Sequence, residues 1–201
     1  MYERYDISLS FVCKRRFQDN GEEALMFFIP DDEETLDSMS YKIVGEVRET
    51  RKNESSTGGI DAVVDGFAKI PRVALMGAIR AIRWLDFWGK NPRVITDGDP
   101  NYSSVLLSNL GSIQAPSVYH HLNNYGTNSI MVTLGTIHKE ERIMPDGTKQ
   151  IRDVVDVGAT LDERIADGFY FARSLKLVRH IFEHPELLDL PLNVPSGFRY
   201  E

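Results

Sequence analysis

Hydrophobic and polar residues alternate at the start of the chain. From residue 6 to residue 13 every second position is apolar, namely Ile7, Leu9, Phe11 and Cys13. A period of two is typical of a strand with one apolar face. After a turn signal at 19–21, the apolar run 24–29 predicts a second strand, buried on both faces, and the pair predicts a hairpin. Because little sequence precedes the first strand, we expect that strand to be uncovered.

A change to helical spacing follows. Acidic residues at 31–34 favour a helix start, and apolar residues at helical spacing predict a helix over about 33–52. Residues 53–59 are rich in Ser, Thr, Gly and Asn, which predicts a flexible loop and the best candidate for an internal linker. Beyond it, the segment 60–89 predicts an unusually apolar helix, with Pro71 at a position that suits a first helical turn.

The apolar helix of 60–89 is interrupted by basic residues, and it has two interpretations. In one, it packs against protein in a core or an oligomer interface, and its arginines bind neighbouring carboxylates. In the other, it lies on a membrane surface with cations at the headgroups. Packing against protein is the commoner arrangement of such helices, and it is the interpretation that the sequence favours. The cations concerned are Arg72, Arg80, Arg83 and Lys90.

The second half of the chain is predicted to consist mainly of strands and to end in a helix. Pro145-Asp146-Gly147 predicts a hairpin turn. A helix is predicted over about 167–183 and is ended by Pro185. The strands are predicted at 104–108, 118–122, 129–134 and 151–161.

Length and composition limit the class of protein. The 201 residues and 22.8 kDa fit one domain, and 42% hydrophobic residues suffice for a core. The formal charge is 23 − 30 = −7, which argues against binding of nucleic acid through the overall field. Cys13 is the single cysteine, which indicates a reducing compartment. Without a signal-peptide pattern or an apolar run that could span a bilayer, we expect a cytoplasmic protein.

The histidines are the first candidates for a base or a metal ligand. His120 and His121 lie in a predicted strand, so their rings are expected on opposite faces, unable to share a metal easily. His180 and His184 are four residues apart at a helix end. No Glu or Cys accompanies them in a known zinc arrangement, so no metal site is predicted. Phosphate loops, dinucleotide fingerprints and nucleophile elbows are absent from the sequence.

Three motifs together carry a family resemblance. Residues 103–111, Ser-Ser-Val-Leu-Leu-Ser-Asn-Leu-Gly, resemble the strand-to-turn motif of the catalytic domain of dihydrolipoamide acyltransferases. Residues 161–168, Leu-Asp-Glu-Arg-Ile-Ala-Asp-Gly, resemble the signature of that family, and 184–188 resemble its ending. These proteins are core components of 2-oxo acid dehydrogenase complexes and share a fold with chloramphenicol acetyltransferase. The resemblance spans about 6–188, except for 57–101, which looks like a helical insertion.

The resemblance implies a fold, substrates and an assembly. We expect one acyltransferase-like domain over 1–201, an α/β fold of the chloramphenicol acetyltransferase type, with a mixed sheet packed by the helices of 33–52 and 167–183. The family's active sites lie in channels between the subunits of a trimer, which implies a homotrimer. Its chemistry implies coenzyme A or acyl-CoA as substrate, with a thiol or another small molecule as acceptor.

Site residues follow from the motifs by position. The oxyanion donor would be Ser108, with Asn109 and Gly111 in the turn that follows it. Asp167 would hold the signature loop through an arginine salt bridge, with Gly168 as its turn glycine. The resemblance places Asn109, Gly111 and Gly168 at the coenzyme A site. Glu163 stands where the family has the histidine that takes the proton from a thiol.

The glutamate leaves three interpretations of the chemistry open. An ordinary carboxyl with a pKa of about 4.3 is a weak base toward a thiol of about 8.5, but burial can raise its pKa by several units. Alternatively, His120 or His121 faces the same channel and acts as the base. In the third interpretation Glu163 pairs with an arginine, and the domain is a catalytically silent oligomerisation module.

The beginning of the chain also departs from the family. Family members have a strand, helices and the arginine partner of the loop aspartate before the segment that corresponds to 6–13. We therefore expect a fragment, a truncated product or a form that a partner covers. We also expect no lipoyl domain in this chain, which argues against assembly into a dehydrogenase complex and leaves that membership open.

Overall fold

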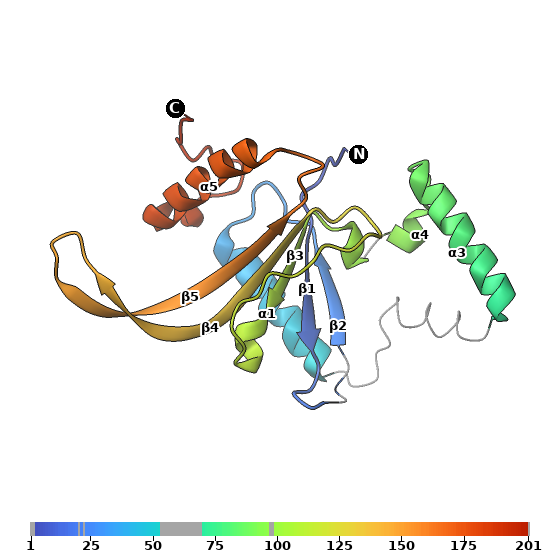
Figure 1. Cartoon of the computed structure of the whole chain (residues 1–201), viewed down its shortest axis with the longest axis horizontal. Coiled ribbons are helices and arrows are strands. Elements are labelled where there is room, and N and C mark those ends of the chain that lie inside the picture. The colour runs from blue at the N-terminus through green and yellow to red at the C-terminus, as the bar shows by residue number, and fades with distance from the viewer. Residues whose placement is uncertain (1–2, 20, 22, 53–69, 97–98, 201) are drawn as a thin grey trace.

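A computed structural model describes residues 3–19, 21, 23–52, 70–96 and 99–200, and these form an α/β fold around a five-stranded mixed sheet (Figure 1). The strand order is β2-β1-β3-β4-β5. The predicted linker 53–59 and the helical expectation for 60–69 lie outside the described residues. The strands are β1 (Leu9–Lys14), β2 (Glu23–Phe28), β3 (Val105–Asn109), β4 (Ile130–Ile143) and β5 (Lys149–Leu161).

The first strand lies inside the sheet. β1 pairs antiparallel with β2, which confirms the predicted hairpin, and parallel with β3 on its other edge. The expectation of an uncovered first strand is therefore wrong, because its partner β3 comes from about a hundred residues later. β2 is the edge strand, and its side chains alternate: Ala24 and Met26 are buried, whereas Leu25 is 44% exposed. The prediction that this strand is buried on both faces is also wrong.

β4 and β5 are longer than the sequence suggested. They form an antiparallel hairpin whose turn contains Gly147 at a φ of +81°. This confirms the predicted turn at 145–147. Their distal halves run past the rest of the sheet as a two-stranded arm (Figure 1). The arm exposes apolar residues, with Ile137, Ile143 and Ile151 each 72% exposed.

Residues 118–122 do not form the predicted strand. The chain at 115–118 crosses β4 and β5, and it is bound there by side chains as well as by backbone. Thr136 N donates to Ala115 O at 3.0 Å, and Thr133 Oγ1 donates to Val118 O at 2.5 Å. The carbonyl of Val118 is therefore used by a side chain of β4, so strand pairing is replaced by a crossover.

The helices are α1 (Leu36–Lys52), α3 (Arg72–Phe87), the short α4 (Arg93–Thr96), which the sequence did not predict, and α5 (Gly168–Glu183). Within the described residues, α1 and α5 match the sequence prediction in place and type, whereas α3 begins only after Pro71, so the predicted helix of 60–89 is not continuous at 70–71. The C-terminal tail meets the start of α1, where Leu192 N donates to Glu34 O at 3.2 Å. An apolar cavity of about 330 Å³ lies between α1, α5 and this tail. α3 stands away from the sheet (Figure 1).

A buried hydroxyl chain joins β1 to the segment that precedes β3. Ser10 and Ser103 are completely buried. Ser10 Oγ donates to Ser103 Oγ at 2.7 Å, and Ser103 Oγ donates to Pro100 O at 2.7 Å. Asn128 Nδ2 donates to Ser103 O at 3.2 Å. Because buried polar groups must be paired, this chain fixes where β3 begins.

Candidate functional site

Ser108 lies near the end of β3, in a row that runs across three strands. It pairs with Thr133 of β4, and Thr133 pairs with Gly158 of β5. Ser108 is half-buried, and within the described residues its hydroxyl has no hydrogen-bond partner. Thr133 is 1% exposed, and its Oγ1 lies 3.0 Å from Ser117 Oγ. The hydroxyl of Ser108 is therefore available as a donor, on a strand that its neighbours hold rigidly.

Glycines make the turn after Ser108 possible. A Cβ on Gly111 would lie 2.6 Å from Gly135 O, and a Cβ on Gly135 would lie 2.5 Å from Ser117 N. A Cβ on Gly158 would lie 2.7 Å from both Thr133 Oγ1 and Val118 O. Side chains at these three positions are excluded by backbone that approaches closely. Gly111, which the resemblance placed at the coenzyme A site, has a packing role in the structure.

Asn109 ends β3 and begins a short 3₁₀ turn (Leu110–Ile113). Its backbone carbonyl accepts a hydrogen bond from Ser112 Oγ at 2.8 Å. The side chain of Asn109 is exposed. This amide is therefore placed at the surface immediately beside Ser108, where a bound molecule could reach it.

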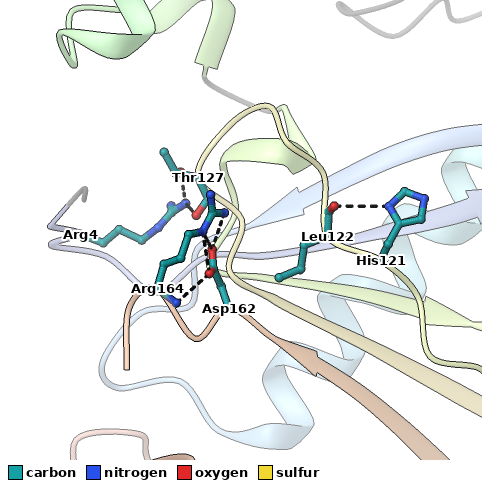
Figure 2. A network of polar contacts seen from close by, with 6 residues as sticks. All are labelled: Arg4, His121, Leu122, Thr127, Asp162 and Arg164. Carbon is teal, nitrogen blue, oxygen red and sulfur yellow. Dashed lines mark hydrogen bonds and ion pairs between the residues drawn. The ribbon is translucent and has the colours of Figure 1, made fainter. Parts of the chain in front are cut away.

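The signature loop leaves the other end of the sheet. Asp162 N donates to Ser129 O at 2.9 Å, which ties the loop to the start of β4. Arg164 binds Asp162 through Nε at 2.8 Å and Nη2 at 2.7 Å, and these bonds lower the pKa of the Asp162 carboxyl. Figure 2 shows this pair beside Arg4 and Thr127. Within the described residues Glu163 is exposed and has no hydrogen bond or ion pair.

Asp167 is the N-cap of α5. Its Oδ1 accepts a hydrogen bond from Tyr170 N at 2.9 Å, which satisfies one of the free N–H groups at the helix start. Within the described residues it forms no salt bridge with an arginine. Gly168 is the first residue of the helix, and a Cβ there would meet nothing within 4 Å. Asp167 thus fixes the loop by capping the helix, which is not the interaction that the resemblance implied.

Strand register separates Ser108 from Glu163. β5 ends at Leu161, which pairs with Ile130, and Ile130 pairs with Val105 at the start of β3. Ser108 is three residues further along β3 and two strands away. At about 3.3 Å per residue and about 4.8 Å per strand, the Cα atoms of Ser108 and Leu161 are roughly 14 Å apart. Glu163 continues beyond Leu161, so one chain does not bring Ser108 and Glu163 together.

The paired histidines lie elsewhere again. The rings of His120 and His121 have centroids 4.8 Å apart, so the prediction that they point to opposite faces is wrong. The reason is that the segment is not a strand. Both are exposed, and Nδ1 of His121 lies 3.3 Å from Leu122 O. In Figure 2 the His121 ring points away from the Asp162–Arg164 pair. No group of three metal-ligating side chains occurs within the described part of the chain.

A hollow of about 790 Å³, lined by both polar and apolar side chains, opens where β1 and β3 begin. Arg4 lies in its wall and donates to the carbonyls of Tyr102, Ser103 and Thr127, and burial lowers the pKa of its guanidinium. Tyr102 OH donates to Asp86 Oδ1 at 3.0 Å, and burial with this bond raises the pKa of Tyr102. Sequence reasoning missed Arg4, because its partners lie about a hundred residues away and no local pattern marks them.

A comparison with protein families matches the part of the chain that carries the predicted motifs. Residues 94–190 match the family model of the 2-oxoacid dehydrogenases acyltransferase (catalytic domain). The predicted acyltransferase resemblance is confirmed. The match contains Ser108, Glu163 and Asp167, and it leaves out most of the segment 57–101 that was interpreted as an insertion. No curated protein matches the chain.

Solved acyltransferase structures share the fold. The chain matches a probable dihydrolipoamide acetyltransferase from Listeria monocytogenes 4b F2365 with a TM-score of 0.55 and 14% identity, over 99% of this chain and 62% of that one. A dihydrolipoamide acetyltransferase (E2p) of Azotobacter vinelandii matches with a TM-score of 0.55 and 11% identity, over 92% of this chain and 57% of that one. The chain therefore has the acyltransferase catalytic-domain fold and spans about three fifths of the structures that it matches.

Proposed function

We propose that this chain is an acyltransferase that moves an acyl group between coenzyme A and a small thiol or other acceptor. The family match over 94–190 supports the acyltransferase assignment. The available hydroxyl of Ser108, at the end of a rigid strand, is the single observation that carries the proposal. Developing charge in acyl transfer requires a donor that is already in place, and Ser108 meets this requirement.

The site is completed by a second copy. The register of β3, β4 and β5 separates Ser108 from Glu163 within one chain. In the family that the chain resembles, the channel lies between subunits, so Ser108 of one copy would face Glu163 of another. Exposed apolar residues on β5 support such an assembly, since Val155 and Val157 are 48% and 53% exposed. We propose a homotrimer.

The acyl-transfer step moves one proton and exchanges one thioester bond for another. The Glu163 carboxylate takes the proton of the acceptor thiol, and the thiolate sulfur attacks the carbonyl carbon of the acyl-CoA thioester. Ser108 Oγ donates a hydrogen bond to the oxyanion of the tetrahedral intermediate. When the intermediate collapses, its bond to the coenzyme A sulfur breaks, and this sulfur takes the proton back from Glu163.

A relative supports the spacing of these residues. In the Azotobacter vinelandii enzyme a serine, a histidine and an asparagine were investigated for their role in the catalytic mechanism, and that histidine and asparagine are four residues apart. Glu163 and Asp167 have the same spacing. We propose that they occupy the equivalent positions, with Asp167 holding the loop as the cap of α5. His121 would then be a channel residue only if a second copy brings it to Ser108.

The test is acyl transfer by the full chain. Acetyl-CoA and dihydrolipoamide are incubated with the protein, and released coenzyme A is measured by chromatography. We expect turnover above background, a loss of about 100-fold or more in Ser108→Ala, and no loss in the control Ser40→Ala, an exposed serine on α1. Equal rates in both variants, or no turnover with several acyl-CoAs and acceptors, would overturn the proposal.

A second candidate is a catalytically silent oligomerisation module. The glutamate in place of the family's histidine favours it. In that case light scattering would give a mass near three times 22.8 kDa while no acyl-CoA is consumed. Turnover that depends on Ser108 would exclude the module.

We also place the protein in the cytoplasm, since Cys13 is its single cysteine and is buried.

A further inference from the structure

α3 carries its large apolar side chains on the outside. Within the described residues none of its side chains is buried. Val73 and Phe87 are 83% and 81% exposed, and Trp84 is 63% exposed. Isolated exposed apolar residues are ordinary, but several on one helix mark a surface that binds something. The remaining large exposed side chains are Met76, Ile79 and, at the C-cap, Trp88.

Aromatic side chains gather at the C-terminal end of the helix. The ring centroids of Phe87 and Trp88 are 5.5 Å apart, and those of Trp84 and Trp88 are 6.4 Å apart. With 3.6 residues per turn, Val73, Trp84 and Trp88 fall within an arc of about 60° on the helix. Phe87 and Met76 widen this apolar arc to about 120°. Arg80 lies inside this arc, and Arg83 lies about 20° beyond its edge.

Charge on this segment is opposite to that of the rest of the chain. Residues 72–90 contain four cations and one carboxylate, a charge of +3, whereas the whole chain carries −7, so the remaining residues carry −10. The carboxylate is Asp86, which is bound by Tyr102 and Asn91. Within the described part of the chain none of the four cations forms an ion pair. These cations are Arg72, Arg80, Arg83 and Lys90.

The helix is held in this exposed position. Tyr102 is 9% exposed, and its hydroxyl donates to Asp86 Oδ1 at 3.0 Å, while Asn91 Nδ2 donates to the same oxygen at 2.8 Å. These bonds anchor the last turn of α3 to the segment that precedes β3. The other end of the helix projects away from the sheet (Figure 1). An anchored, projecting helix can reach a partner that the sheet does not touch.

From these observations we infer that α3 binds the surface of an anionic lipid bilayer, lying in the plane of the interface. Arg80 lies within the exposed apolar arc, and Arg72 and Arg83 lie at its margin. A protein partner would need a carboxylate opposite each of them, because an unpaired charge in an interface is costly. Phosphate headgroups supply the counter-charges anywhere on the membrane, while the aromatic rings enter the acyl boundary.

The length of the helix agrees with this orientation. No helix among the described residues is long and apolar enough to cross a membrane. Arginine side chains can extend along apolar surface and keep the guanidinium at the headgroups. The interpretation that the sequence favoured, packing against protein, does not explain why free arginines lie among the exposed aromatic residues. The inference is independent of the proposed acyl transfer.

The experiment uses the tryptophans of the full chain. Both are on this segment, Trp84 in α3 and Trp88 at its C-cap, so tryptophan emission, excited selectively over the tyrosines, reports on this segment. Vesicles of phosphatidylcholine with half phosphatidylglycerol are compared with pure phosphatidylcholine, by emission and by co-sedimentation. We expect a blue shift and binding with the anionic vesicles only. Binding that is equal on both vesicles, or absent from both, would overturn the inference.

Variants that remove arginines test whether α3 is the surface that contacts the bilayer. Each basic residue near an anionic bilayer contributes about fivefold in affinity, so Arg80→Gln combined with Arg83→Gln should weaken binding by about 25-fold. The control Arg142→Gln with Arg152→Gln removes the same charge from the β4–β5 arm and should bind like the unmodified protein. If both pairs weaken binding equally, α3 is not the contact. Far-UV circular dichroism checks that each variant is folded.

Two further measurements test the apolar contact and the dependence of binding on salt. Val73→Ser with Phe87→Ser retains both tryptophans and all four cations, and it should weaken binding by at least tenfold through lost apolar contact. If a variant does not fold, the unmodified protein is titrated with salt, and release from anionic vesicles by about 0.5 M salt is expected. A blue shift that depends on protein concentration without vesicles would show that a second copy covers α3, and would overturn the inference.

Discussion

The surroundings of Ser108 and those of Glu163 differ in how completely one chain builds them. Near Ser108 three glycines and a buried threonine pack closely against backbone, and a Cβ on Gly158 would lie 2.7 Å from two oxygen atoms. Around Glu163 the chain is an exposed loop, in which Asp162 binds Arg164 through its side chain and Ser129 through its backbone. The first half of the candidate site is closely packed in the single chain, whereas in the second half no described residue forms a hydrogen bond or ion pair that orients the Glu163 carboxylate.

This contrast locates the missing part of the site. A base that takes a proton must be held within hydrogen-bond distance of it. The described residues pair the strand of Ser108 on both edges, but they form no hydrogen bond or ion pair with Glu163. A neighbouring copy is the simplest source of the contacts that would fix it, as proposed above.

The largest expected effect concerns the base. Glu163→His should raise thiol-dependent acyl transfer by about 100-fold, because imidazole titrates near neutrality, about two pKa units above an ordinary carboxyl group, and general-base assistance is large when geometry is right. The measurement is coenzyme A release from acetyl-CoA with dihydrolipoamide. Glu163→Gln is the control and should reduce turnover. A Glu163→His protein that is folded but less active would show that the carboxylate is already the better base in the assembled channel.

The next effect concerns packing near Ser108. Gly158→Ala should lower the free energy of unfolding by about 2–3 kcal/mol, because its methyl group meets Thr133 Oγ1 and Val118 O. Gly77→Ala in α3 is the matched control: a Cβ there meets nothing within 4 Å. It should stabilise the helix by about 0.5–1 kcal/mol. Urea unfolding followed by far-UV circular dichroism measures both. A neutral Gly158→Ala would contradict the close packing described here.

The buried side chain of Tyr102 lies at the end of the sheet where the Glu163 loop leaves, and it should make the stability of the protein depend on pH. Burial, with hydrogen bonds to Tyr125 and Asp86, raises its pKa in the folded state. Its contribution to stability is therefore fully present below about pH 10, the ordinary tyrosine value, and it is lost as the pH rises above that value. From about pH 10 upward the Tm of the unmodified protein should fall more steeply than that of Tyr102→Phe. Tyr119→Phe, which removes the hydroxyl of an 86% exposed side chain, should not change the slope.

The smallest effect concerns the helix cap at the end of the signature. Asp167→Ala should cost about 1 kcal/mol of stability, because the free N–H of Tyr170 loses its acceptor. Asp167→Asn keeps an acceptor and should be nearly neutral. The midpoints of urea unfolding compare the two variants. If Asp167→Asn costs as much as the alanine variant, the charge itself matters, and a cation from another copy would be indicated.

Local patterns predicted most elements of this fold. The helices at 36–52 and 168–183 and the strand at 105–109 were expected within a few residues, because their signals are contained in the segments themselves. The strand predicted at 118–122 failed for a physical reason. The carbonyl of Val118 accepts a hydrogen bond from the Thr133 side chain, and no pattern within the segment reveals a side-chain partner fifteen residues later.

The candidate site was less predictable than the fold. Ser108, Glu163 and Asp167 were found through motifs of a family, not through spacing or charge. Their roles depend on contacts between distant segments, such as the register that links Ser108 to Gly158. The position of β1 inside the sheet also depends on a contact between distant segments. Its partner lies 96 residues later, so the sequence around β1 could not show that both its edges are paired.

The pairing of β1 with β3 has a consequence for folding kinetics. Leu9 and Val105 are joined only after about ninety-five residues are closed into a loop, whereas β4 and β5 meet across a five-residue turn. The β4–β5 hairpin should therefore form first, and the β1–β3 ladder should be the slow step. Closure entropy grows only with the logarithm of loop length, and each doubling costs about 0.6 kcal/mol. The connection that carries α3 can thus lengthen or shorten during evolution with little effect on whether the sheet assembles.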